Sequence, residues 1–325
     1  MSVAPHPYKT NRAQIVVGVQ SDQGADVAPT RHPGLMKGGQ ELADPEVNWI
    51  EERVIGGNRD PFQHIEGKHA YEGGNWNVVP FDGWPIAFVL GKDSYDGTAG
   101  THTITRKQED PPPTVTVEGS YFGSGSQPDF SRAVFGVGAN SGTITINNED
   151  ELTMSVETMG LGLTDDTTDG SRTPTNLTLP DRRPWTFNKV SSNLSMAGTS
   201  FARVTNWELQ IQNNLSGYHY LESENEHDPY EMLYGNGDYS LKVEVAITDD
   251  GLYQELADPA TDGFTTTIEL TKDSGDSITL ETENSRIRAA SPTFPDEGTV
   301  KQQLEMNPNG ATITVDDSSS SAAYV

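Results

Sequence analysis

The chain has 325 residues, of which only 33% are apolar, and its 48 acidic against 21 basic residues give a net charge of −27 at pH 7. This charge excludes nucleic-acid binding, because affinity for phosphates needs a basic surface, and the absence of cysteine excludes disulfides and thiol chemistry. The sequence has neither a run of about 18 apolar residues nor an apolar N-terminal stretch, so we expect no membrane span and no secretory signal.

Residues 1–40 are predicted to form an N-terminal arm with one strand. The strand is expected at residues 13–20, AQIVVGVQ, whereas residues 21–39 are rich in Gly, Asp, Pro and Thr. Irregular segments of this length are usually functional or disordered. The arm therefore either lies on a neighbouring subunit or is a floppy terminus.

The stretch 60–91 has a second copy in the chain. Shifted by 168 positions, it lies without a gap on residues 228–259. The shift superimposes Asp60-Pro61-Phe62 on Asp228-Pro229-Tyr230, Gly67 on Gly235, and Asp82-Gly83 on Asp250-Gly251. A repeat of this length predicts two copies of one structural unit, with chance similarity as the alternative.

Each copy is expected to contain a strand and then a short helix of about two to three turns. Apolar and polar residues alternate over 239–248, which places one set on a buried face. Asp82 and Asp250 are N-cap candidates, because a carboxylate accepts hydrogen bonds from the free N–H groups of the first turn. Gly91 and Pro259 are expected to end the two helices.

The rest of the chain is predicted as short strands and turns. Their spacing of roughly 8–12 residues is typical of β-sandwiches or barrels. Trp49 and Trp207 each follow an asparagine near the start of a unit, and we expect both in the core. Strands are expected at 48–55, 102–107, 114–122, 133–138, 142–147, 151–160, 185–196, 203–214, 264–272, 276–284, 285–291, 299–306 and 311–315.

The most linker-like stretch is 164–175, TDDTTDGSRTPT, and it separates the two units. Four regions are therefore expected: the arm at 1–40, a first unit at 41–175, a second unit at 176–317, and a flexible low-complexity tail at 318–325. The predicted fold class is mainly β, with two tandem β-sandwich or barrel units that each carry a short helix.

Several stretches, in this order along residues 12–317, resemble tail tube proteins of long-tailed double-stranded DNA viruses. They are IVVGVQSDQG, GGNRDPFQHIEGKHAYEG, PFDGWPIAFVLG, SGTITINNEDELTMSVETMG and GTVKQQLEMNPNGATITV. The resemblance implies a structural virion protein that stacks as rings into a hollow tube, with strands of neighbouring subunits joined in a closed barrel. The dispersed acidity with few lysines favours a halophilic, archaeal host, because salt screens self-repulsion.

The resemblance also implies partners and a location. Family rings are mostly hexamers of a single-unit protein, so two units per chain predict a trimeric ring with pseudo-sixfold symmetry; a sixfold ring of whole chains is the alternative. The other expected partners are tail terminator, tape measure and baseplate proteins, and viral DNA that passes through the lumen without specific binding. The protein is expected in the virion tail, after synthesis in the host cytoplasm.

The predicted oligomer interface includes the two Asp-Pro-aromatic loops. Pro61, Phe62, Pro229 and Tyr230 are the candidate residues, since aromatic anchors carry a large share of interface energy. No nucleophile elbow, Walker loop or metal-ligand spacing is found, so we expect no catalytic residue, cofactor or metal.

A secreted adhesion protein of a halophile, with tandem β-sandwiches, is the alternative function. The sequons at Asn176, Asn193 and Asn214 would suit it, although three sequons arise easily by chance.

Overall fold

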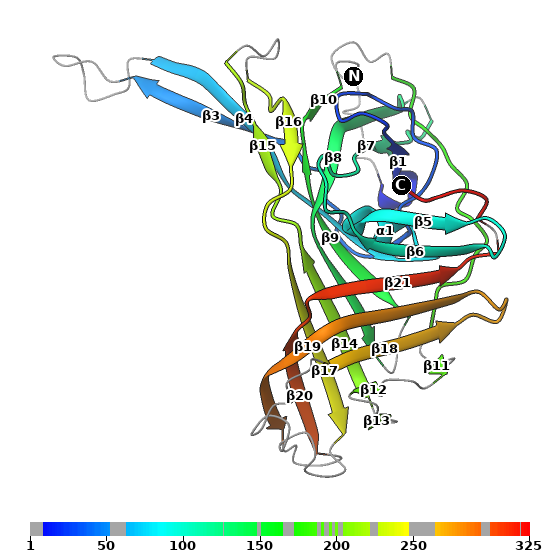
Figure 1. The fold of residues 1–325 in the computed structure, drawn as a ribbon. Helices are drawn as coiled ribbons and strands as arrows, with labels where there is room; N and C mark the ends of the chain where they lie inside the picture. The colour runs from blue at the N-terminus through cyan, green and yellow to red at the C-terminus, as the bar shows by residue number, and fades with distance from the viewer. Residues whose placement is uncertain are drawn as a thin grey trace.

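The structure is a computed structural model that describes residues 9–52, 63–125, 127–147, 151–164, 172–186, 190–191, 195–196, 199–200, 204–221, 227–246, 264–293, 300–318 and 320–325. Strands dominate this part of the chain, and one α-helix lies among them (Figure 1). The mainly-β prediction is confirmed.

Elements of the first half begin with a short 3-10 helix. Their bounds are η1 Thr10–Arg12, β1 Ala13–Val19, β2 Leu35–Met36, β3 Pro45–Glu52, β4 Gln63–Val79, α1 Trp84–Leu90, β5 Gly91–Asp96, β6 Thr101–Arg106, β7 Val115–Tyr121, β8 Phe130–Asn147, β9 Thr153–Gly160 and β10 Gly162–Leu163. Those of the second half are β11 Val190–Ser191, β12 Ser195–Met196, β13 Thr199–Ser200, β14 Val204–Gln212, β15 Ser216–Tyr218, β16 Glu231–Leu233, β17 Asp238–Ala246, β18 Phe264–Thr271, β19 Ser277–Thr293, β20 Lys301–Asn307 and β21 Gly310–Asp316.

Eight antiparallel strands form a central sheet in the order β3-β4-β9-β8-β14-β17-β20-β19. The first four strands come from the first half of the chain and the last four from the second half. The β8–β14 pairing joins the two sets. The described strands do not close into a barrel within the chain, and β3 and β19 lie at the two ends of the sheet.

Two long strands leave the central sheet and continue in covering sheets. The first part of β8 pairs with β7 and β10, and β7 pairs with β1. The first part of β19 pairs with β18 and β21, and this sheet is extended by β11 on one side and by β6 and β5 on the other. A separate turn between 133–138 and 142–147 was expected, but β8 runs through it; β19 likewise joins the strands expected at 276–284 and 285–291.

Bulges keep β8 and β19 continuous. Against β9, the register of β8 shifts between Ala139 and Ser141; against β20, the register of β19 shifts between Ile287 and Ala289. Each strand also has one residue at positive φ, Gly136 at 61° and Asn284 at 46°. Glycine and asparagine are the residues that adopt this conformation most readily. A bulge re-aims a strand without ending it, so turn-like residues here do not mark a turn.

Helix α1 forms where the first of the two helices was predicted. Gly83, rather than the predicted Asp82, is its N-cap residue; Asp82 accepts a hydrogen bond from the Trp84 N–H (3.0 Å), and Gly91 ends the helix at φ 89°, as predicted. All seven helix residues are buried, and Phe88 stacks on both Trp76 and Trp84. The predicted second helix falls at 250–259, outside the described residues.

One apolar core runs through both halves of the chain. Trp207 is fully buried in it, as predicted, together with the alternating residues of β17. The prediction for Trp49 is wrong, because its side chain is 56% exposed. It lies on the β3–β4 hairpin, which extends beyond the body of the molecule (Figure 1), where no second layer covers it.

The C-terminal residues do not extend as the predicted flexible tail. Tyr324 is buried and stacks on His102 with ring centroids 3.8 Å apart. Its N–H donates to Asp93 (2.7 Å) and its hydroxyl to Asp317 (3.0 Å). Burial of an aromatic side chain with its polar groups satisfied holds this segment in place.

Candidate self-assembly surfaces

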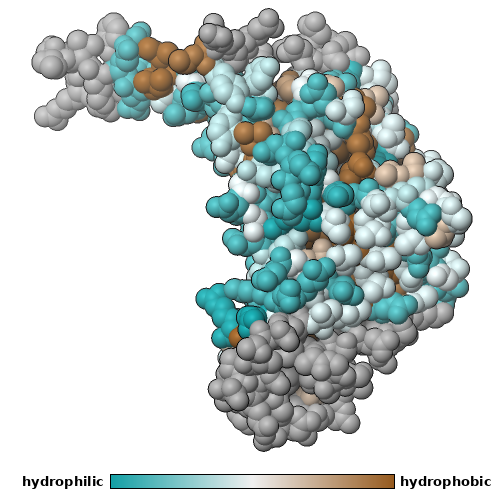
Figure 2. Space-filling view, in the orientation of Figure 1, coloured by the Kyte–Doolittle hydropathy of each residue, from teal (hydrophilic) through white to brown (hydrophobic). Residues whose placement is uncertain are grey.

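The first candidate surface is the outer hairpin, formed by β3 and the beginning of β4. Its two strands pair with Ile50 opposite Ile65. Trp49, Ile50 and Ile65 are 56%, 52% and 40% exposed, and an apolar patch is visible on this extension in Figure 2. A group of exposed large apolar side chains on a projecting element is typical of a protein–protein contact.

The second candidate surface is the inner hairpin, formed by β15 and β16, beside the outer one in Figure 1. Tyr218, Tyr220 and Tyr230 are 45%, 50% and 63% exposed. The rings of Tyr220 and Tyr230 pack edge to face with centroids 5.5 Å apart, and Tyr220 hydrogen-bonds to Glu231. Clustered tyrosines of this kind are enriched at protein interfaces.

A polar cluster ties the two hairpins together. Asp228 Oδ1 accepts from the Tyr71 hydroxyl (2.8 Å) and lies 2.7 Å from His69 Nδ1, while His69 Nε2 lies 2.9 Å from Glu66. The backbone N–H of His69 donates to the carbonyl of His227 (2.8 Å). Burial lowers the pKa of His69, but the hydrogen bonds to Asp228 and Glu66 outweigh it and raise the pKa above its usual value.

The four predicted interface residues have different surroundings. Pro61 and Phe62 lie outside the described residues, on the stretch that connects β3 to β4. Pro229 is buried, next to Gly217 of β15, so it positions the loop. Tyr230 is the most exposed tyrosine named above. Sequence reasoning missed Trp49, Ile50 and Ile65, because strand alternation does not reveal whether a strand lies on the body or beyond it.

The third candidate surface is the polar face of the central sheet, opposite the core. Alternation along the strands places half-exposed polar side chains on this face. Its charged residues include Glu157, Glu208, Lys242, Glu244, Lys301 and Glu305. Lys242 pairs with Glu208 (3.1 Å) and Lys301 with Glu244 (2.8 Å), and the latter hydrogen bond lowers the pKa of Glu244.

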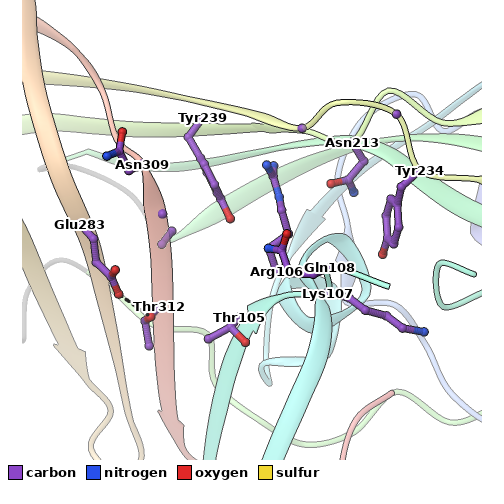
Figure 3. A pocket seen from close by; sticks show the side chains of 14 residues that line it. Thr105, Arg106, Lys107, Gln108, Asn213, Tyr234, Tyr239, Glu283, Asn309 and Thr312 are labelled. Atoms are coloured by element: carbon purple, nitrogen blue, oxygen red, sulfur yellow. Dashed lines mark hydrogen bonds between the residues drawn. The ribbon is translucent and has the colours of Figure 1, made fainter. Parts of the chain in front are cut away.

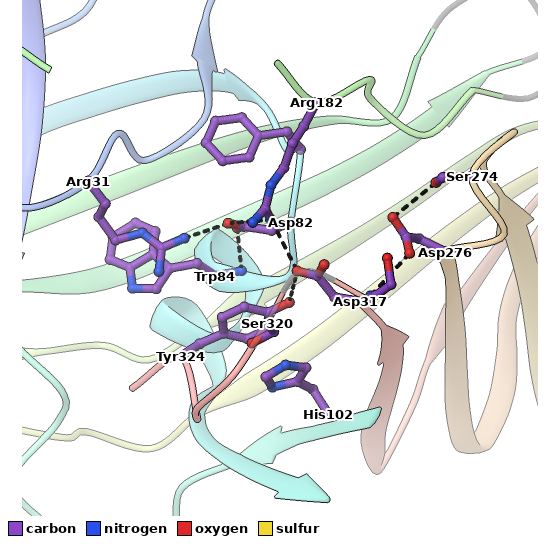
Figure 4. A network of polar contacts seen from close by, with 12 residues as sticks. Arg31, Asp82, Trp84, His102, Arg182, Ser274, Asp276, Asp317, Ser320 and Tyr324 are labelled. Atoms are coloured by element: carbon purple, nitrogen blue, oxygen red, sulfur yellow. Dashed lines mark hydrogen bonds and ion pairs between the residues drawn. The ribbon is translucent and has the colours of Figure 1, made fainter. Parts of the chain in front are cut away.

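Polar contacts in two places link the two halves of the chain. In the cavity of Figure 3, the Arg106 guanidinium lies 3.9 Å from the Tyr239 ring centroid and donates to the carbonyl of Gln212 (2.9 Å). In the network of Figure 4, Asp82 of the first half pairs with Arg31 (2.6 Å) and with Arg182 of the second half (3.7 Å), and Arg182 also pairs with Asp317 (3.2 Å). These contacts hold the two halves in one orientation.

The described residues contain no group of three or more His, Cys, Asp or Glu side chains that could hold a metal ion. In the same part of the chain, no helix is both long and apolar enough to cross a membrane.

Comparison with known proteins gives one family. The model of the family described as phage tail tube protein matches residues 10–317, which is nearly the whole chain. No curated protein matches. The matched range includes both hairpins, both halves of the central sheet and helix α1.

Proposed function

Since the chain belongs to the phage tail tube protein family, we propose that it stacks as rings into the hollow tube of a viral tail and conducts the genome to the host cell. The family match over residues 10–317 carries this proposal. The role is structural, with no catalytic step. The match gives no support to the alternative of a cell-surface adhesion protein.

Each chain contributes two tandem tail-tube units to the ring. The strand order β4-β9-β8 of the first half corresponds to β17-β20-β19 of the second. The bulges of β8 and β19 and the positive-φ residues Gly136 and Asn284 recur 148 positions apart. Such correspondence of order and irregularity supports duplication of one unit, because bulges are specific features of a fold.

The hairpins support the same duplication. Ile50 pairs with Ile65 in the outer hairpin, and Gly217 pairs with Met232 in the inner one. Gly217 lies 167 positions after Ile50, and Met232 lies 167 positions after Ile65. This shift is one position fewer than the shift of 168 that aligns the two sequence copies. Two units per chain support a trimeric ring with pseudo-sixfold symmetry.

The ring closes the central sheets of its subunits into one barrel. Each central sheet is open at β3 and β19, and closure removes exposed sheet edges, which otherwise favour aggregation. The polar face of the sheet then lines the lumen. Four of its six named charges are glutamates, so DNA passes such a wall without adhering to it.

The remaining expectations follow from tail assembly. Tail terminator, tape measure and baseplate proteins are the proposed partners, and the virion tail is the proposed location, after synthesis in the host cytoplasm. The halophilic, archaeal host rests on composition alone. With a net charge of −27, rings are expected to need salt, because screening reduces repulsion between subunits.

Electron microscopy of the purified chain in molar salt tests this function. We expect tubes or rings, with three chains per layer after rotational averaging. Six chains per layer would retain the tube and overturn the trimer. Monomers only, over a range of salt and protein concentrations, would overturn the tube itself.

A further inference from the structure

We propose that the free edge of β19 in one chain pairs with residues 41–45 of a second copy, and that Arg288 of the first chain meets Glu46 of the second. This inference rests on the proposed function, because it assigns the contact between neighbours in the ring. It uses the β8–β14 junction inside the chain as a template for the junction between chains.

The template is a regular antiparallel pairing. Residues 141–147 of β8 lie opposite residues 212–206 of β14, with Ile144 facing Leu209. Just before this ladder, Asn140 sits at the bulge of β8, where its side-chain oxygen accepts from the Leu215 N–H (2.9 Å) and its carbonyl from the Asn213 N–H (2.9 Å). The bulge residue thus contacts the residues that directly follow β14.

β19 corresponds to β8 with a constant difference of 148 positions. Ile144 pairs with Met154 of β9, and Pro292 pairs with Gln302 of β20. Both members of the second pair lie 148 residues after those of the first. The bulge residue equivalent to Asn140 is therefore Arg288, and residues 289–293 correspond to 141–145.

The counterpart of β14 in the first half is the segment that pairs with β4. This follows because β4 corresponds to β17, and β17 pairs with β14. Lys242 of β17 pairs with Glu208 of β14, and Asn75 of β4 forms a bridge with Glu41. The two pairs are related by a constant difference of 167 positions. Residues 206–212 thus correspond to 39–45, and Asn213 corresponds to Glu46.

The β19 edge is unpaired in the described structure, and the first-half segment lines a groove, although its Asp44 N–H donates to the Leu42 carbonyl (2.8 Å). Beyond β20, no strand of the described residues pairs with residues 289–293 of β19. A groove of about 1000 Å³ follows the first-half segment, and Gly39, Gln40 and Leu42 are among its lining residues. An extended strand from a neighbour can be added at such an edge.

Charge fits the same pairing. The side chains of Arg288 and Glu46 are both exposed, and no hydrogen bond or ion pair to either is found within the described residues. The polar contact of Asn140 with residues 213–215 would thus be replaced, between chains, by an ion pair of opposite charges. Because the two edges differ, the contact is head to tail, which is the type that generates closed rings.

Charge reversal tests the pairing. The variants Arg288→Glu and Glu46→Arg each place like charges at every junction, so we expect each to lower the polymerised fraction about tenfold in a sedimentation assay. The double variant restores opposite charges and is expected to polymerise within about twofold of the original chain. The assay uses the lowest salt at which the original chain forms tubes, since salt screens exposed charges.

Arg183→Glu is the matched control. Its side chain is 84% exposed, and the substitution makes the same change in net charge as Arg288→Glu, away from both edges. Circular dichroism checks that every variant is folded.

The outcomes separate this inference from the proposed function. Normal polymerisation of both single variants, or failure of the double variant to recover, would overturn the pairing and leave the tube in place. Failure of the original chain to polymerise would overturn both.

Discussion

The outer and inner hairpins have the same strand pairing but differ in burial at an equivalent apolar position. Ile65 of the outer hairpin is 40% exposed, whereas Met232, at the corresponding position of the inner hairpin, is fully buried. Met232 packs with Leu161 and Leu215 in a small apolar cluster. The inner hairpin thus uses its apolar side chain for the stability of its own chain, and the outer one leaves it at the surface.

The N-terminal half of the chain explains part of this difference. Gln23 donates through Nε2 to the carbonyl of Met232 (2.9 Å) and accepts at Oε1 from its N–H (2.9 Å). The side-chain amide therefore completes the hydrogen bonding of the inner hairpin, as a neighbouring strand would. Similar backbones can hence serve folding in one unit and, in our proposal, assembly in the other.

The largest effect is expected from the two tryptophans. Trp207→Ala removes a fully buried side chain and should lower the free energy of unfolding by about 3–5 kcal/mol. Trp49→Ala should change it by less than about 0.5 kcal/mol, because the side chain is exposed, yet should reduce tube growth. Denaturant unfolding and electron microscopy measure the two effects. A large loss of stability in Trp49→Ala would contradict the assignment of Trp207 to stability and of Trp49 to assembly.

The next test compares the equivalent positions of the two hairpins. Met232→Ala should cost about 2–5 kcal/mol of unfolding free energy through the cavity that it leaves, whereas Ile65→Ala should leave stability nearly unchanged and weaken assembly. Both variants are measured by denaturant unfolding and by sedimentation of polymer. If Ile65→Ala polymerised as well as the original chain, the outer hairpin would not be an assembly surface.

Regular alternation made the strands of the second half predictable. Tyr239, Leu241, Val243 and Val245 are buried as expected, because the face of the central sheet on which they lie packs into the apolar core. The same rule failed at β8 and β19, where bulges let turn-like residues stay within a strand.

The candidate surfaces were harder to predict for a related reason. Exposure of Trp49 follows from the position of the outer hairpin beyond the body, and no local pattern encodes that position. Arg288 and Glu46 are likewise ordinary surface charges in the sequence. They become candidates only when the pairing registers of the two halves are compared.

A smaller effect is expected where Gln23 supports the inner hairpin. Gln23→Ala leaves the buried N–H and carbonyl of Met232 without their partners, so the free energy of unfolding should fall by about 1–3 kcal/mol. Gln40→Ala is a control, because Gln40 makes similar side-chain to backbone hydrogen bonds with Asn77 at the more exposed first-half edge. Equal losses of unfolding free energy in the two variants would indicate that burial of the Gln23 amide adds nothing to the stability that its hydrogen bonds provide.

The smallest effect concerns the link between the hairpins, and its sign depends on pH. The raised pKa of His69 means that its protonated form is favoured in the folded chain. Its contribution is therefore complete below the unfolded pKa of about 6.5 and is lost as the pH rises through the higher folded value. The other titratable groups around it are Glu66, Lys68, Tyr71, His219, His227 and Asp228.

His69→Gln isolates this contribution from those neighbours. The difference in unfolding free energy between the original chain and the variant should be below about 1 kcal/mol. It should shrink between about pH 6, just below the usual histidine pKa, and about pH 8.5, about two units above it. Denaturant unfolding at a series of pH values measures it. A difference that stayed constant across this range would show that His69 joins the hairpins through packing and neutral hydrogen bonds, because only a charged imidazole makes the Asp228 contact depend on pH.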